Sequence, residues 1–327
     1  MLALSEISIT CFAASYAVAW ALEVSRLVFR SRARRAIMLG FAAAGLLAHT
    51  LYLGFSATAA EGAPLASSFD WTLVAAWLLM TVYFYFSYYY PQAAIGLFIF
   101  PLVLGLIGAA ALFADRAPIV SPSSNRAWGA IHGVFLLLGT VAVMVGFVAG
   151  SMYLLQAYRL KHKLPPMQGL RLPSLESLET VNSRSLALST LLVTIGFLAG
   201  IVLRSRSESG SLPWSDPVVW SSALMLGWLL AATIFNAVYK PARRGRKVAY
   251  LTIVSFVFVA FALGVLLLVD TRHAPKSELQ RVSSGERKQW EEMVPFTHLT
   301  DRYTCLVGCV KRTMGSSAAG AMEEAAS

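Results

Sequence analysis

Eight long apolar runs are the feature that most constrains what this chain can fold into. They cover about residues 7–29, 36–56, 71–89, 93–113, 128–155, 186–203, 218–238 and 248–269. An α-helix needs about 20 predominantly apolar residues to cross the hydrocarbon core of a bilayer. Only 13% of the 327 residues are charged, whereas soluble domains contain about 25%. The runs therefore predict an all-α, polytopic integral membrane protein with about eight transmembrane helices.

The Lys and Arg residues predict how these helices are oriented. Basic residues concentrate in the cytoplasmic loops of membrane proteins. With the N-terminus outside, the inner loops contain 15 Lys and Arg residues, the outer loops contain 4, and the other 8 follow the eighth run. The net charge of +10 is thus explained by membrane topology, and no nucleic-acid partner is expected. We expect a multi-pass protein of the cell inner (plasma) membrane with both termini outside.

The apolar runs also predict the division of the chain into domains. Residues 1–273 form the predicted transmembrane helical domain, and the polar segment 274–327 is predicted to be a disordered tail. Between the fifth and sixth runs, Leu175 and Leu178 follow Ser174 at helical spacing, and Ser is a favoured N-cap residue. This pattern predicts a short interfacial helix within 164–184.

Two histidines are expected on the outer side of the membrane. His132 lies at the start of the fifth run and His273 follows the eighth. The outer segment 212–220, which reaches into the start of the seventh run, contains Trp214, Asp216 and Trp220. Haem iron accepts imidazole nitrogen as an axial ligand, and aromatic side chains pack against a porphyrin. The pattern suits a haem site without requiring one. The alternatives are that the histidines and tryptophans are interfacial anchors and that Asp216 is a helix N-cap.

His49 is predicted to lie inside the membrane, in the second run and nearer its outer end. Ionisable side chains within a membrane span are rare and commonly functional. His49 is therefore either a ligand within the bilayer or a neutral imidazole that bonds to a neighbouring helix, and the sequence leaves both possibilities open.

Several stretches resemble the cytochrome c assembly family (CcsA/ResC/HemX-like) in both order and spacing. They are 128–161, which contains His132; 172–200; 214–220, which resembles the end of the family's tryptophan-rich loop; 264–275, which contains His273; and, in the N-terminal half, 45–54, which contains His49 and resembles the HemX-type branch.

The resemblance implies a role in c-type cytochrome biogenesis. The protein would bind or transport haem b and present it at the outer membrane face for attachment to apocytochrome c, together with a second membrane subunit. His132 and His273 would be the axial ligands, and Trp214, Asp216 and Trp220 would form the haem-binding loop. His49 would be a ligand within the membrane. The chain would then be a membrane subunit of a haem-attachment (cytochrome c synthetase) system, and whether it is an enzyme stays open.

Two departures from the family pattern keep other functions under consideration. The tryptophan-rich loop is abbreviated, and Asn236 stands where a second intramembrane histidine is expected. An amide is a poor ligand for haem iron, so a HemX-like regulator of haem biosynthesis is one alternative. A small-solute membrane transporter with purely interfacial histidines is an alternative of another class.

The orientation can be tested with reporter fusions. Fusions at Lys163 and Arg244 should report the cytoplasm, and fusions after Ser123 and Ser211 should report the outside, because basic loops remain in the cytoplasm. One fusion on the opposite side would separate His132 from His273 and contradict the predicted haem site.

Overall fold

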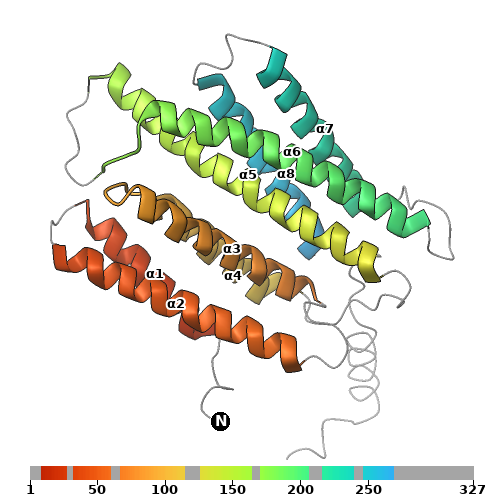
Figure 1. The fold of residues 1–327 in the computed structure, drawn as a ribbon, viewed down its shortest axis with the longest axis horizontal. Helices are drawn as coiled ribbons and strands as arrows, with labels where there is room; N and C mark the ends of the chain where they lie inside the picture. Colours follow the sequence, from red (N-terminus) through yellow and green to blue (C-terminus); the bar gives the residue numbers. More distant parts are fainter. Residues whose placement is uncertain are drawn as a thin grey trace, which may run out of the picture. The chain divides into compact units, whose positions relative to one another are not determined.

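The computed structural model describes residues 9–27, 32–59, 67–114, 126–163, 170–205, 216–238 and 246–268. Within these ranges it contains eight α-helices and no β-strand (Figure 1). They are α1 (Ile9–Ser25), α2 (Arg32–Ala59), α3 (Ser68–Tyr89), α4 (Gly96–Phe113), α5 (Arg126–Lys161), α6 (Leu175–Ser205), α7 (Pro217–Val238) and α8 (Arg246–Leu268). The predicted all-α fold is confirmed. His273, Trp214 and the tail 274–327 lie outside the described residues, so the predicted domain boundary stays a prediction.

The helices have the length and composition of membrane spans. Of the described helices, the seven from α2 to α8 are long and apolar enough to cross a bilayer. The described part of α1 has 17 residues, a length of about 25 Å at 1.5 Å per residue. The protein is therefore a multi-span membrane protein, as predicted. The orientation of the helices in the membrane stays a prediction. The term "inner" is used below for the end of the bundle where α1 ends and α2 begins.

The start of α6 differs from the prediction. Instead of a separate interfacial helix followed by a span, one continuous helix runs from Leu175 to Ser205. The expected cap is present, because the Ser174 hydroxyl accepts a hydrogen bond from the Ser177 backbone N–H at 3.2 Å. No proline or glycine interrupts the residues from Leu175 to Leu186, so nothing ends the helix before the apolar run begins.

Helices α5 and α6 form a closely packed antiparallel pair. A Cβ atom on Gly139 would lie 2.6 Å from Val193 Cγ2, so the contact requires glycine at this position. Lipid tails are as apolar as the side chains, so helices in a membrane gain little from the hydrophobic effect when they associate. Close packing matters more, and small residues allow the two backbones to approach. On another side of α5, the Phe147 ring stacks on Phe256 of α8 with centroids 4.1 Å apart.

A buried amide joins the same three helices. Asn182 of α6 is 2% exposed. With its amide oriented to satisfy both atoms, the nitrogen donates to Thr252 Oγ1 (2.8 Å) and Gly146 O (3.0 Å), and the oxygen accepts from Ala249 N (3.3 Å). Polar groups need partners in hydrocarbon, so this set of bonds fixes the register of α5, α6 and α8.

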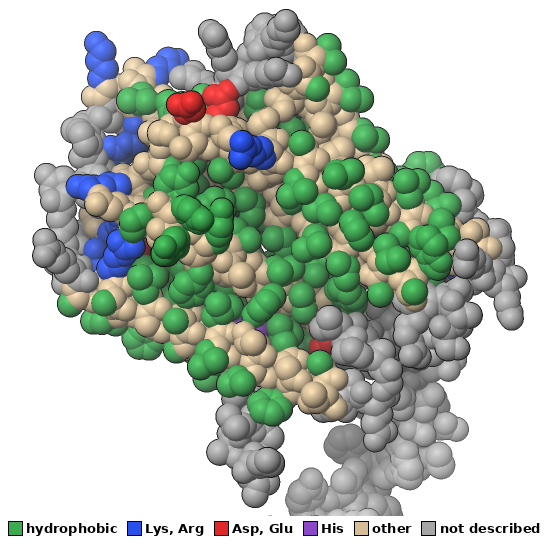
Figure 2. Space-filling view, in the orientation of Figure 1, with side chains coloured by type: hydrophobic (Ala, Val, Ile, Leu, Met, Phe, Trp, Pro, Cys, Tyr) green, Lys and Arg blue, Asp and Glu red, His purple; other side chains and the backbone are tan. Residues whose placement is uncertain are grey.

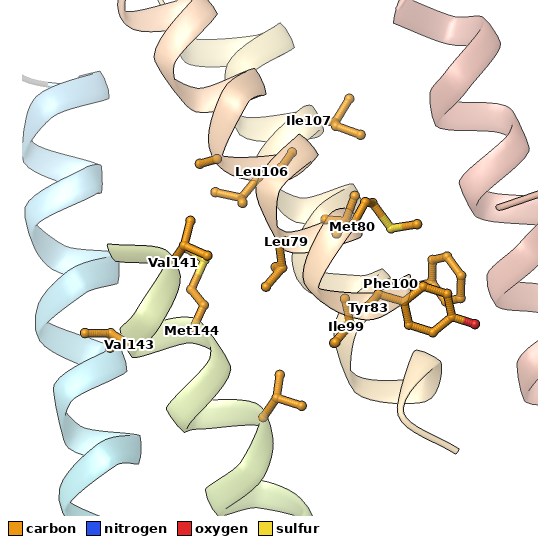
Figure 3. Close-up of a cluster of buried hydrophobic side chains, with 14 of the residues drawn as sticks. Leu79, Met80, Tyr83, Ile99, Phe100, Leu106, Ile107, Val141, Val143 and Met144 are labelled. Atoms are coloured by element: carbon orange, nitrogen blue, oxygen red, sulfur yellow. The ribbon is translucent and has the colours of Figure 1, made fainter. Parts of the chain in front are cut away.

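The N-terminal helices are joined to α5 by apolar packing. Figure 3 shows side chains from α3, α4 and α5 that meet in one buried cluster. The labelled members are Leu79, Met80, Tyr83, Ile99, Phe100, Leu106, Ile107, Val141, Val143 and Met144.

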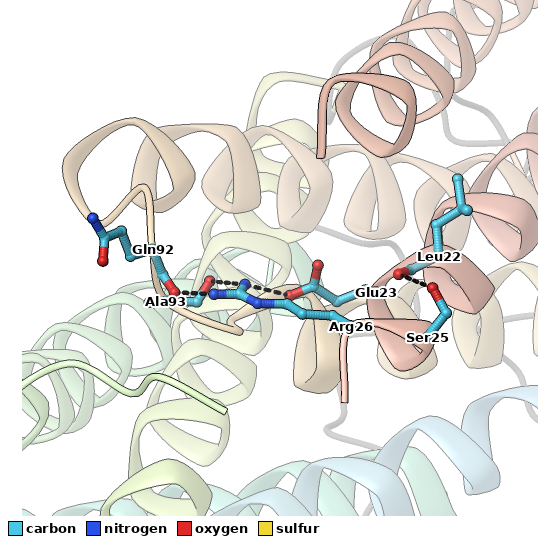
Figure 4. Close-up of polar contacts among 6 residues, drawn as sticks. All are labelled: Leu22, Glu23, Ser25, Arg26, Gln92 and Ala93. Carbon is cyan, nitrogen blue, oxygen red and sulfur yellow. Dashed lines mark hydrogen bonds and ion pairs between the residues drawn. The ribbon is translucent and has the colours of Figure 1, made fainter. Parts of the chain in front are cut away.

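At the inner end, polar contacts join the N-terminal helices to the segment before α6. Arg26 forms an ion pair with the buried carboxylate of Glu23 at 3.2 Å and donates to the carbonyl groups of Gln92 and Ala93 (Figure 4). The Gln92 side-chain oxygen accepts in turn from Arg171, whose backbone carbonyl accepts from Ala94 N at 2.8 Å. We call this set of contacts, formed by Glu23, Arg26, the 92–94 turn and Arg171, the inner clasp.

The surface has the charge distribution expected of a membrane protein. In Figure 2, hydrophobic side chains cover the middle of the visible face, and most visible Lys and Arg side chains gather toward the end where α1 ends and α2 begins. This is the end that the loop charges assign to the cytoplasm.

The inner clasp predicts a large effect of Arg26→Ala. Removing Arg26 would leave the Glu23 carboxylate, whose side chain is 4% exposed, without its ion-pair partner. Breaking a buried pair costs up to about 3–5 kcal/mol, so we expect a free energy of unfolding in detergent about 3 kcal/mol lower. The double variant Glu23→Gln/Arg26→Ala should recover part of the loss, because no unpaired charge remains. No recovery would mean that the ion pair contributes little.

Candidate functional site

The imidazole of His132 lies in a notch on α6. His132 is in the second turn of α5, and its Nδ1 lies 2.8 Å from the backbone oxygen of Gly196. A Cβ atom on Gly200 would lie 2.6 Å from the same nitrogen. A carbonyl oxygen can only accept a hydrogen bond, so Nδ1 carries the proton that it donates. In the neutral ring, the lone pair is then on Nε2, which is the form that binds a metal ion.

The end of α8 lies at the level of His132. Phe147 of α5 stacks on Phe256 of α8, and Gly150 of α5 lies against Ala249. Antiparallel helices rise equally per residue, so the level of His132 on α5 corresponds to the described end of α8, Leu268, within about one turn. His273 follows five residues later and lies outside the described residues, so its predicted role as a ligand is untested.

Two members of the predicted haem-binding loop lie within the described residues. Asp216 is 5% exposed, and its Oδ1 accepts from Val218 N at 2.9 Å. It therefore caps α7, which was the alternative considered for it. Trp220, in the first turn of α7, is 61% exposed. Trp214 lies outside the described residues, so the haem-binding role of all three stays a prediction.

His49 is fully buried between α1 and α2. Its ring stacks on Phe12 of α1 with centroids 4.2 Å apart and planes 2° apart. Its Nδ1 lies 3.4 Å from the Tyr16 hydroxyl, while its Nε2 is buried and has no hydrogen-bond partner among the described residues. One half of the imidazole thus bonds to a neighbouring helix, which was one of the two expected possibilities. The other half has an unsatisfied nitrogen, as an iron ligand would before binding.

His49 and His132 do not share a site. His49 faces α1, whereas His132 faces α6. Ser56 of α2 lies 3.5 Å from Asp70, and Trp71, the next residue, lies against Gly133 beside His132. His49 precedes Ser56 by two helical turns, so it lies about 10 Å deeper than His132.

Asn236 is buried in α7 near its inner end. Its Nδ2 donates to Ser183 Oγ on α6 at 2.9 Å, and its Oδ1 is buried without a hydrogen-bond partner among the described residues. The amide links α6 to α7, and it does not lie beside His49, which faces α1. The described residues therefore do not pair His49 with a second ligand at this position.

The sequence did not predict three groups of residues that surround His132 and His49 in the structure. They are the Gly196/Gly200 notch, Trp71 next to Gly133, and the pair of Phe12 and Tyr16 around His49. The spacing of Gly196 and Gly200 is a helix-packing motif that the sequence displays, but only the tertiary structure shows that its partner is an imidazole.

The comparisons with known proteins agree with this architecture. The sequence matches the family model described as "Cytochrome C assembly protein" over residues 9–273. The match covers all eight helices and most of the chain. This chain therefore belongs to the cytochrome c assembly protein family.

Its curated relatives are named "Cytochrome c biogenesis protein CcsA". The protein of Guillardia theta is 24% identical over 232 residues, which cover 64% of this chain and 76% of the relative. The protein of Microcystis aeruginosa is 25% identical, with 64% and 78% covered, and that of Gloeobacter violaceus is 22% identical, with 64% and 78% covered. No solved structure matches the chain.

Proposed function

We propose that this protein binds haem b at its outer face and presents it for attachment to apocytochrome c, with His132 and His273 as the two axial ligands. Membership of the cytochrome c assembly family gives it a role in c-type cytochrome biogenesis, and haem handling fits that family. The axial ligands, the haem type and the outer site are the parts that we propose.

The observation that carries the proposal is the hydrogen bond from His132 to Gly196. A metal-binding imidazole commonly donates its second N–H to a carbonyl or carboxylate, which fixes the ring and makes the other nitrogen more basic. His132 has this arrangement through Nδ1 at 2.8 Å. The end of α8 at the same level supports His273 as the second ligand.

A basic residue follows the notch on the same face of α6. Arg204 lies in the last turn of α6, four residues beyond Gly200, and residues four apart share a helix face. Haem carries two propionates, so a guanidinium on the face that contacts His132 suits the edge of the porphyrin. In the proposed site the two imidazoles would hold the iron, Arg204 would pair with a propionate, and the loop with Trp214, Asp216 and Trp220 would pack against the ring.

The proposal includes a location and partners. We propose the cell inner (plasma) membrane, a second membrane subunit of the cytochrome c assembly system, and apocytochrome c outside.

A HemX-like regulator of haem biosynthesis is the second candidate function, and Asn236 favours it. This residue bonds to Ser183 and offers an amide where an intramembrane histidine is expected. Loss of c-type cytochromes after gene deletion would support the first function, and their retention with altered haem synthesis would support the second.

Replacing either outer histidine should expose one axial position of the iron. We expect His132→Ala and His273→Ala to convert a six-coordinate, low-spin haem spectrum to a five-coordinate one. Added imidazole should restore the low-spin spectrum, because a small ligand can occupy the opening. Trp214→Ala should lower haem occupancy without changing the ligation state. His162→Ala, at the inner end of α5, is the matched control. Wild-type spectra in both histidine variants would contradict the proposed ligation.

Replacing His49 with Phe distinguishes two roles for this residue, that of a haem ligand and that of a packing residue. Phe can stack on Phe12 and removes the unsatisfied Nε2, but it also leaves the buried Tyr16 hydroxyl without its Nδ1 partner. In the double variant Tyr16→Phe/His49→Phe both polar groups are removed, so the haem-free protein should be about as stable as the wild type. If His49 is a second haem ligand within the membrane, as the family resemblance implies, total haem per protein should fall while the spectrum of the remaining outer haem is unchanged. Thermal unfolding and haem content measure the two effects. Unchanged haem content would leave His49 with a packing role alone.

A further inference from the structure

The contact between His132 and α6 depends on the absence of two side chains. Gly196 and Gly200 are four residues apart and lie on one face of α6. A Cβ atom on Gly200 would lie 2.6 Å from His132 Nδ1, and one on Gly196 would lie 2.9 Å from Leu136, one turn along α5 from His132. Real side chains avoid such distances, so the imidazole reaches the α6 backbone only because both positions are glycine.

The group at the base of the notch is a backbone carbonyl. Within an α-helix, the oxygen of residue 196 already accepts from the N–H of residue 200, and a carbonyl oxygen has a second lone pair for another donor. His132 Nδ1 occupies that second position at 2.8 Å. Because this acceptor belongs to the backbone, it cannot rotate away or change its protonation.

We propose that Gly196 and Gly200 are positioning residues for His132: the glycine notch fixes the Nδ1–H tautomer and so presents Nε2 as the nitrogen that binds haem iron. This inference rests on the proposed ligation of haem by His132. It adds a role for α6, which contributes no ligand of its own.

The rival explanation is that the two glycines only allow α5 and α6 to pack. The chain contains a matched control for that explanation. Gly139 lies on α5 at the same helix–helix interface, and a Cβ atom there would lie 2.6 Å from Val193 Cγ2. The predicted clash therefore equals the one at Gly200, but it does not involve His132.

The experiment compares Gly200→Ala and Gly139→Ala in the full-length purified protein, by haem titration and optical spectra. Disturbing the hydrogen-bond partner of a metal ligand typically lowers affinity about 10- to 100-fold. We expect a loss of this size, with a smaller low-spin fraction, in Gly200→Ala. Gly139→Ala should retain an affinity close to that of the wild type, even if both variants lose similar thermal stability. Equal affinities in the two variants would overturn the proposal.

A second measurement tests the carbonyl bond without relying on either alanine variant. In His132→Gly, imidazole has an N–H that can donate to Gly196 O while its other nitrogen binds iron, and 1-methylimidazole has no such N–H. We expect imidazole to restore the low-spin spectrum at lower concentration than 1-methylimidazole does, relative to their binding to free haem. Equal restoration would overturn the proposed role of the carbonyl. If His132→Gly has the wild-type spectrum, the proposed ligation itself fails, an outcome distinct from the other two.

Discussion

The close contact of α5 with α6 is the interaction on which the rest of the described structure depends. Glycines along α5 let the two backbones approach, and the buried amide of Asn182 then fixes their register with α8. Lipid is as apolar as the side chains, so shape and hydrogen bonds determine how these helices associate. The same contact that holds the bundle together brings His132 to the backbone of α6, so the candidate site is a product of the packing.

The N-terminal helices depend on other interactions. Their apolar cluster meets α5 through Val141 and Met144 (Figure 3), and the inner clasp joins their turn at Gln92 to the segment before α6 (Figure 4). His49 belongs to this half, where its partners come from α1. Within the described helices, His132 and His49 thus lie in separate environments at different depths, the first polar and next to a helix backbone, the second aromatic and fully enclosed.

The sequence predicted the helices well because membrane spans are determined by the length and composition of local runs. It failed at the start of α6, where polar residues before Leu186 continue the helix beyond the apolar run. It identified His132 and His49 but could not give their environments. The sequence around Gly196 does not indicate that this glycine contacts His132, and Tyr16 lies 33 residues from His49. The arrangement of side chains from different helices depends on tertiary packing, which local patterns do not encode.

The proposed function requires that this chain bind haem through two imidazoles at its outer face. The most direct measurement is low-temperature electron paramagnetic resonance of the ferric wild-type protein, purified from a membrane fraction and quantified for haem. Ligation by two imidazoles should give bound haem with a low-spin signal typical of two histidine ligands. A protein that purifies without haem and binds none on titration, or a purely high-spin signal, would contradict it.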